Sequence, residues 1–175
     1  MNKKLKLEEL NRLSVTQFKQ SKKDPIIVVL DNIRSLNNIG SIFRTCDAMG
    51  TKKIYLCGIT AQPPHREIRK TAIGASESVD WEHQQNASDV LSKYRKLNYS
   101  IVSVEQTSKS VSFENFIFKK KTVLIFGNEV DGVSQKLIDL SDLTLEIPQW
   151  GTKHSMNISV CVGIVLWNLK ISYLK

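Results

Sequence analysis

An asparagine and an arginine six residues apart are the first candidates for chemistry in this sequence of 175 residues. Asn38 and Arg44 lie in residues 31–50, DNIRSLNNIGSIFRTCDAMG, which follow an apolar, β-branched run. The planar guanidinium of an arginine binds phosphate or carboxylate through two parallel hydrogen bonds. We expect Asn37 and Asn38 to cap the following helix, and Gly40 to let another backbone approach it. Taken alone, Arg44 also fits an ordinary surface ion pair.

Two further segments place polar side chains after predicted strands. Residues 126–134, FGNEVDGVS, contain Glu129, whose carboxylate either meets a ligand or belongs to a simple turn into a helix. Residues 147–163, IPQWGTKHSMNISVCVG, lead into an apolar helix for which Ser155 is the expected N-cap. Asn157 would then lie inside the first turn, where asparagine has poor helix propensity and needs another reason.

A parallel α/β sheet is the architecture expected to position these segments. From Pro25 onward, short β-branched runs alternate with segments of helical period, as in strands joined by crossover helices. The expected strands are residues 26–30, 53–57, 100–104, 122–126 and 144–147. The expected helices are residues 38–48, 87–97, 134–140 and 155–173. Ligands of open α/β sheets bind outside the carboxyl ends of the strands, which is where the three polar segments lie.

Composition indicates an ordinary folded domain. Apolar residues make up 41% of the chain and charged residues 24%. The longest apolar run, residues 158–167, falls short of the about 20 residues that span a membrane, so we expect a buried helix and no membrane partner. The N-terminus lacks the apolar stretch of a secretory signal, which favours a cytoplasmic protein. Three scattered cysteines lack metal-ligand spacing, so no metal site is expected.

The net charge of +8 favours a polyanion such as RNA or DNA as partner. Basic residues are concentrated at the N-terminus, so we expect residues 1–24 to form a basic helix or arm and residues 25–175 to form one domain. The arm is consistent with a nucleic-acid contact, with a solvated helix whose leucines pack on the domain, or with both. The leucines in question are Leu5, Leu7, Leu10 and Leu13.

Together the three polar segments resemble the SpoU/TrmH-type branch of the SPOUT superfamily, RNA methyltransferases that act on ribose 2′-hydroxyls. The resemblance covers nearly all of residues 25–175, with three motifs in the family's order and spacing. The first motif matches Asn38, Arg44 and residues 46–50, the second residues 124–132, and the third Ile147, Pro148 and residues 155–159. Residues 70–81, KTAIGASESVDW, also resemble the family's Gly-Ala turn.

The resemblance implies an α/β, parallel-sheet SPOUT fold with a C-terminal deep trefoil knot, a homodimer, and S-adenosylmethionine as cofactor. By position, Gly127, Ile147 and Met156 match the residues that hold the adenine and ribose of the cofactor. Ile147 and Met156 offer apolar walls for a purine, and a glycine lets backbone meet a ligand. Leucine is commoner in the family at position 156, and exchanging it for methionine conserves volume.

The catalytic positions of the family match Asn38, Arg44, Ser155 and Asn157. A ribose hydroxyl is a weak nucleophile, and the family mechanism assigns its activation to the arginine. Because a guanidinium deprotonates only above about pH 12, we expect Arg44 to grip a substrate phosphate and stabilise the developing alkoxide. Asn38, Ser155 and Asn157 would orient Arg44, ribose and cofactor. Glu129 would organise the knot or contact the substrate.

Three other functions fit parts of the sequence. A relative acting on a base nitrogen would use a carboxylate in place of the arginine, and a noncatalytic RNA-binding protein would keep the knot as a scaffold. A Rossmann-like nucleotide-binding protein is disfavoured, because the first turn lacks GxGxxG. Among RNAs we favour tRNA over rRNA, since the only appended segment is the short basic arm. His154 fits an exposed loop residue, and Trp150 fits base stacking or shielding of the knot.

Overall fold

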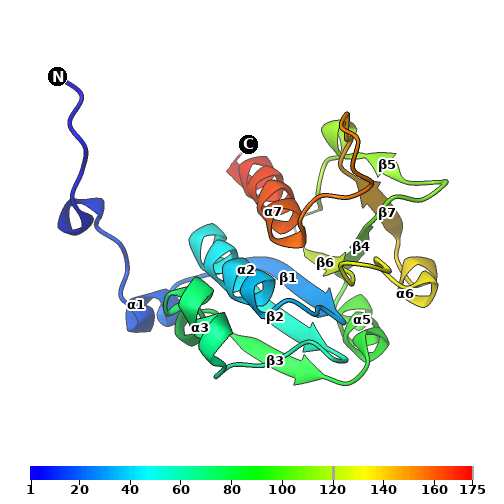
Figure 1. Cartoon of the computed structure of the whole chain (residues 1–175), viewed down its shortest axis with the longest axis horizontal. Coiled ribbons are helices and arrows are strands. Elements are labelled where there is room, and N and C mark those ends of the chain that lie inside the picture. Colours follow the sequence, from blue (N-terminus) through cyan, green and yellow to red (C-terminus); the bar gives the residue numbers. More distant parts are fainter. Residues whose placement is uncertain (120, 175) are drawn as a thin grey trace.

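The computed structural model describes residues 1–119 and 121–174, and within them seven strands form one parallel sheet (Figure 1). The strands are β1 Asp24–Asp31, β2 Thr51–Cys57, β3 Trp81–Gln84, β4 Ser100–Val104, β5 Val111–Ser112, β6 Thr122–Phe126 and β7 Leu143–Glu146. Their order across the sheet is β3-β2-β1-β6-β4-β7-β5. The predicted α/β class and parallel sheet are confirmed, while Lys120 and Lys175 of the expected domain lie outside the described residues.

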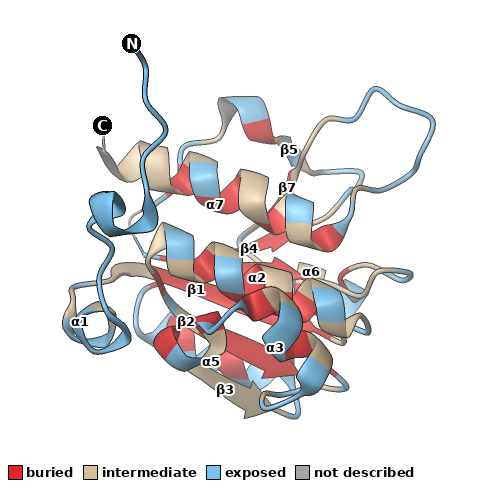
Figure 2. Ribbon diagram, turned by 60° about the vertical axis from the view of Figure 1, so that its left-hand side comes forward, coloured by how far each residue is buried: buried red, intermediate tan, exposed pale blue. Residues whose placement is uncertain are grey.

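Helices cover both faces of the sheet. They are α1 Val15–Gln20, α2 Leu36–Met49, α3 Arg66–Ala72, α4 Ala75–Ser78, α5 Ala87–Lys96, α6 Gln135–Asp139 and α7 Ile158–Leu174, with short 3-10 helices η1 Leu7–Leu10 and η2 Phe113–Asn115. Alternate residues of β1 enter two cores: Val28 packs with α2 and α7, and Val29 packs with α5 and α6. Figure 2 shows the buried sides of α2 and α7 turned toward the sheet. A strand buried on both faces reads as a continuous apolar run, as β1 does.

The elements that the sequence did not predict are short or polar. β3, with the sequence WEHQ, pairs only with β2 at one edge of the sheet and is half-buried throughout. β5 has two residues and pairs with β7 at the other edge. α3 and α4 fill the segment expected only as a turn, and Gly74, with φ of 84°, begins α4 there. Edge elements lack the apolar runs that mark central strands.

The C-terminal helix corrects two expectations. α7 begins at Ile158, three residues later than predicted, and it is not buried all round. Leu166 and Leu169 on its inner side are fully buried, whereas Val160 and Trp167 are 51% and 58% exposed. An apolar stripe of α7 therefore faces outward. No helix among the described residues is both long and apolar enough to cross a bilayer.

The basic N-terminal segment extends from the domain as an arm (Figure 1). It contains η1 and α1 and ends where β1 begins at Asp24. Its four leucines are exposed, so the expectation that they pack on the domain is wrong. Phe18 of α1 packs against the core in their place.

Gly40 of α2 permits the close approach of α3, as predicted. A Cβ at this position would lie 2.0 Å from Thr71 Oγ1 and 2.4 Å from the carbonyl oxygen of Ile68. Thr71 donates a hydrogen bond to the carbonyl oxygen of Asn37 at 3.1 Å, which closes the same contact. The start of α2, where Asn38 lies, is thus held against α3 on one side.

Replacing Gly40 by alanine should destabilise the protein, because the added methyl group meets a backbone carbonyl that cannot turn away. We expect Gly40→Ala to lower the free energy of unfolding by about 1–3 kcal/mol, as overpacking of a tight contact does. Urea unfolding followed by circular dichroism measures this change. The matched control is Gly151→Ala, since a Cβ at Gly151 would have no neighbour within 4 Å. Equal stability of the two variants would contradict the packing described.

Candidate active site

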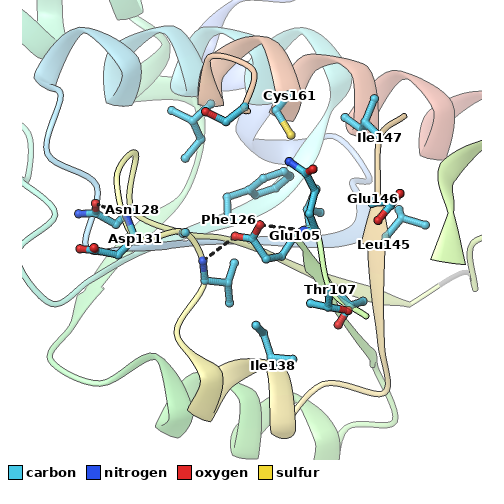
Figure 3. Close-up of a pocket in the computed structure, with 18 of the residues that line it drawn as sticks. Glu105, Thr107, Phe126, Asn128, Asp131, Ile138, Leu145, Glu146, Ile147 and Cys161 are labelled. Carbon is cyan, nitrogen blue, oxygen red and sulfur yellow. Dashed lines mark hydrogen bonds between the residues drawn. The ribbon is translucent and has the colours of Figure 1, made fainter. Parts of the chain in front are cut away.

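An open cavity of about 1170 Å³ lies at the carboxyl ends of β4, β6 and β7 (Figure 3). Its walls come from residues 104–109 after β4, 126–133 after β6, 141–147 around β7, and 154–158 at the start of α7. This edge of the sheet is where ligands of open α/β folds bind. The cavity agrees in place with the site expected from the sequence.

Most of the predicted site residues meet in this cavity. Those that line it are Gly127, Glu129, Ile147, Ser155, Met156 and Asn157. Asn38 lies behind the lining and is joined to it by hydrogen bonds. Arg44 lies apart, because its side chain is exposed on α2 and does not line the cavity.

The carboxylate of Glu129 joins the second motif to the first. One oxygen accepts hydrogen bonds from the backbone N–H of Ser35 at 3.0 Å and from Asn38 Nδ2 at 3.1 Å. The other accepts from the backbone N–H of Arg34 at 2.9 Å. Partial burial raises the pKa of Glu129, but these hydrogen bonds together lower the pKa below its ordinary value. Glu129 is therefore ionised at neutral pH and fixes the start of α2.

Asn157 joins the third motif to the first. Its Nδ2 donates to Asn38 Oδ1 at 3.1 Å, and its Oδ1 accepts from the backbone N–H of Ser159 at 2.9 Å. The carbonyl oxygen of Asn157 also accepts the first helical hydrogen bonds, from Val160 and Cys161. Asn157 is thus the N-cap of α7. This role explains why an asparagine, which has poor helix propensity, occurs at the start of this helix.

Two capping predictions are consequently wrong. Ser155 precedes α7 by three residues and does not cap it, and its side chain is exposed at the cavity. Asn37 and Asn38 lie within α2, whose N-cap is Ser35. Ser35 Oγ accepts a hydrogen bond from the backbone N–H of Asn38 at 3.3 Å. Because Ser35 takes over the cap, the amide of Asn38 is free to bind Glu129 and Asn157.

Gly127 is required by the turn in which it lies. A Cβ there would lie 2.1 Å from the carbonyl carbon of Gly132 and 2.2 Å from the backbone nitrogen of Val133. Asn128 closes the same turn, since its side chain donates to the carbonyl oxygen of Asn32 at 2.8 Å and accepts from the backbone N–H of Val130. The glycine is therefore explained by contacts within the chain, whatever ligand meets its backbone.

Sequence reasoning missed Glu105, the residue that follows β4 and lines the cavity. Its carboxylate accepts a hydrogen bond from the backbone N–H of Val133 at 2.9 Å. An acidic residue directly after a predicted buried strand was the available signal.

The side chain of Arg44 makes no hydrogen bond or ion pair to any residue that the structure describes. The surface ion pair considered from the sequence is thus not formed. Thr45, the next residue on α2, lies 3.9 Å from the position of a Cβ on Gly163 of α7. Arg44 is accordingly an unpaired cation close to the contact between α2 and α7.

Three other side chains lie at or near the cavity. The pKa of the Cys161 thiol is raised to about 12, chiefly by burial, which keeps the thiol neutral. His154 is exposed and contributes its carbonyl oxygen, which accepts from Gln106 Nε2 at 2.8 Å. Trp150 is 86% exposed. No group of three or more metal-ligating side chains occurs in the described part of the chain.

Neutralising Glu129 should loosen the junction of the three motifs. We expect Glu129→Gln to lower the free energy of unfolding by about 1–2 kcal/mol at pH 7, because an amide group would face an N–H donor that the carboxylate now satisfies. The lowered pKa of Glu129 means that its contribution is present above the unfolded-state pKa and is lost as pH falls through the folded-state pKa. The difference between wild type and variant should therefore shrink below pH 4.

Urea unfolding at pH 7 and pH 3 measures that difference. Glu8→Gln serves as the control, since Glu8 is an exposed side chain of the N-terminal arm. A stability difference for Glu129→Gln that is absent at pH 7, or that is unchanged at pH 3, would show that the carboxylate does not hold the junction.

The sequence profile of the SpoU rRNA Methylase family matches residues 25–167. A tRNA (guanosine(18)-2′-O)-methyltransferase of Aquifex aeolicus is 32% identical over 166 residues, which cover 91% of this chain and 74% of that protein. The crystal structure of the A. aeolicus TrmH/SpoU tRNA modifying enzyme is similar with a TM-score of 0.82 at 28% identity, covering 91% of this chain and 81% of that one.

A second solved structure, the AdoMet-bound rRNA methyltransferase of Sinorhizobium meliloti, has a TM-score of 0.79 at 26% identity and covers 88% of this chain and 59% of that one. The family profile spans the strands, the cavity and the three linked motifs described above. The chain therefore belongs to the SpoU rRNA methylase family, whose members are S-adenosylmethionine-dependent RNA methyltransferases.

Proposed function

We propose that this RNA methyltransferase modifies a ribose 2′-hydroxyl, with tRNA as its preferred substrate. The observation that carries the proposal is the junction of Glu129, Asn38 and Asn157, which ties the helix of Arg44 to the wall of the cavity. Such a junction places a cation-bearing helix and a ligand cavity in a fixed relation. Glu129 accepts hydrogen bonds from three donors and so holds the junction together, and we do not assign it the removal of a proton from a nucleobase nitrogen.

The cavity fits the cofactor of the family. Its lining combines apolar side chains, among them Phe126, Ile147 and Met156, with the backbone of a glycine turn at Gly127. Apolar walls with a few polar groups suit a purine nucleoside. We assign Gly127, Ile147 and Met156 to the adenine and ribose of the cofactor. When bound, S-adenosylmethionine supplies an activated methyl group, and the protein needs no metal for that chemistry.

Arg44 is assigned to the substrate. A guanidinium offers a planar fork of N–H donors, so we assign Arg44 a clamp on an RNA phosphate and the stabilisation of a developing alkoxide. Asn38 and Asn157 set the position of α2 against the cavity, and Ser155 offers an exposed hydroxyl at its edge. Glu129 acts through the backbone of Arg34 and Ser35, as a positioning residue.

The exposed cations support RNA as substrate. On α2, α3 and the loop before them, several basic side chains are exposed and form no ion pair within the described residues: Arg34, Arg44, Arg66, Arg69 and Lys70. Unpaired cations on one side of a basic protein suit a phosphate backbone. We propose that residues 1–24 add a separate basic arm to residues 25–175, and that the protein works in the cytoplasm, where tRNA is matured.

A knot and a homodimer complete the proposal. We propose that the chain before α7 passes through the loops after β4 and β6 to form a deep trefoil knot. The hydrogen bond from Gln106 to His154 and the similarity to the A. aeolicus structure support this path. The outward apolar stripe of α7 at Val160 and Trp167 supports a second copy packed on it. Because α2 packs beside α7, a second copy packed on the outward stripe of α7 would lie close to the helix that carries Arg44.

The assigned chemistry predicts loss of turnover without loss of cofactor binding in Arg44→Ala. We expect the rate of methyl transfer to tRNA to fall at least 100-fold, the cost of removing one oxyanion-stabilising donor, while the Kd for S-adenosylmethionine stays within twofold. Arg44→Lys keeps the charge but not the planar fork, so its rate should be intermediate. Nuclease and alkali digestion of the product reads the site, since a 2′-O-methyl group blocks alkaline cleavage of its linkage.

The control is Lys52→Ala, an exposed cation of β2 far from the cavity. Turnover of Arg44→Ala within a few-fold of Lys52→Ala would remove Arg44 from the mechanism. Alkali-sensitive methylated product from the wild type would instead favour modification of a base.

The exposed apolar stripe of α7 predicts a homodimer that dissociates when a charged side chain is introduced into the stripe. We expect the wild type to sediment as a dimer at micromolar concentration, and Trp167→Glu to sediment as a monomer with much reduced methyl transfer, because burying a carboxylate in an apolar interface is unfavourable. Trp150→Glu, at another exposed tryptophan, should stay dimeric. A monomeric wild type, or dissociation by both substitutions alike, would contradict the proposed interface. Analytical ultracentrifugation provides the measurement.

A further inference from the structure

A carboxylate without an assigned role lies at the centre of the cavity. Glu105 follows β4 and is half-buried in the lining. Figure 3 shows its side chain between Cys161 of α7 and Ile138 of α6, with Phe126 beside it. A charged group in such a place either neutralises the opposite charge of a ligand or adds an uncompensated desolvation cost to the fold.

Backbone groups fix the orientation of this carboxylate. One oxygen accepts from the N–H of Gln106 at 2.7 Å, and the other accepts from the N–H of Val133 at 2.9 Å. The turn is shaped around it, because a Cβ on Gly132, whose φ is 69°, would lie 2.1 Å from Glu105 Oε2. Each carboxylate oxygen keeps a further lone pair for a ligand.

No cation within the described residues neutralises Glu105. The ion pairs there use Glu9, Glu82, Asp142 and Asp24 as their acids. Lys109 and His154, the basic residues of the lining, form no ion pair with Glu105. The negative charge of Glu105 reaches into the cavity, where it adds to the burial that raises the pKa of Cys161.

We propose that Glu105 is the counter-ion for the positive charge of the bound cofactor. The inference rests on the proposed function, which puts S-adenosylmethionine in this cavity. That molecule carries two cations, a sulfonium and an α-ammonium group, and a fixed, unneutralised carboxylate complements either. Glu105 is then a specificity-determining residue, because it favours the charged cofactor over neutral nucleosides of similar shape.

The test compares the binding of three ligands by isothermal titration calorimetry. S-adenosylmethionine carries both cations, S-adenosylhomocysteine carries the ammonium only, and 5′-methylthioadenosine carries neither. For Glu105→Gln we expect the Kd for S-adenosylmethionine to rise about tenfold, the scale of a lost hydrogen bond to a charged group. The Kd for methylthioadenosine should stay within twofold. Glu114→Gln, which removes the same charge at an exposed position outside the cavity, should change neither value.

The titration with S-adenosylhomocysteine identifies which cation of the cofactor Glu105 contacts. An equal rise for S-adenosylhomocysteine supports contact with the ammonium, and no rise supports contact with the sulfonium. Equal weakening of all three ligands would show that Glu105 only shapes the turn and would overturn the proposal, as would no weakening of any. A wild type that binds none of the three ligands would instead remove the cofactor from this cavity, and with it the proposed function.

Discussion

The carboxylate of Glu129 is the contact on which the arrangement of the site depends. It accepts hydrogen bonds from the backbone N–H groups of Arg34 and Ser35, which lead into α2 more than ninety positions away in the chain, and from the amide of Asn38. Asn38 in turn meets Asn157, the cap of α7. One ionised group thus sets the positions of two helices and one turn relative to a common cavity. An anion at the start of α2 also complements the helix dipole.

Charge is divided between the inside and the outside of this molecule. The chain carries a net charge of +8, yet the cavity lining contains Glu105, Glu129, Asp131 and Glu146. Arg34, just before α2, and the exposed basic side chains of α2 and α3 do not line the cavity. An enzyme that binds a cationic cofactor and a polyanionic substrate needs opposite potentials at neighbouring sites, and this division supplies them. Such a division of charge favours phosphate binding at the basic surface over binding in the acidic cavity.

The central strands were predictable because each is marked by the apolar pattern of its own short stretch of sequence. β1, β4 and β6 are apolar runs, and their expected positions agree with the structure to within two residues. Edge elements such as β3 were not predicted from the sequence, because they are polar and short. The gathering of Gly127, Ile147, Met156 and Asn157 around one cavity came from a resemblance to a family, since contacts between separate loops leave no periodic signal in the sequence. The caps were misassigned because Ser155 and Asn38 have capping chemistry, but tertiary contacts decide which residue uses it. Glu105 was missed although it directly follows a predicted strand, because one acidic residue at such a place is a weak signal, and its bond to Val133 depends on the fold.

Ribose methylation in cells shows whether this protein modifies a 2′-hydroxyl of tRNA. Small RNA from cells that lack this protein, and from the same cells with wild-type protein restored, would be digested to nucleosides and compared by mass spectrometry. We expect one 2′-O-methylnucleoside of tRNA to disappear without the protein and to return with it. An unchanged set of ribose-methylated nucleosides, or the loss of a base-methylated one, would contradict it.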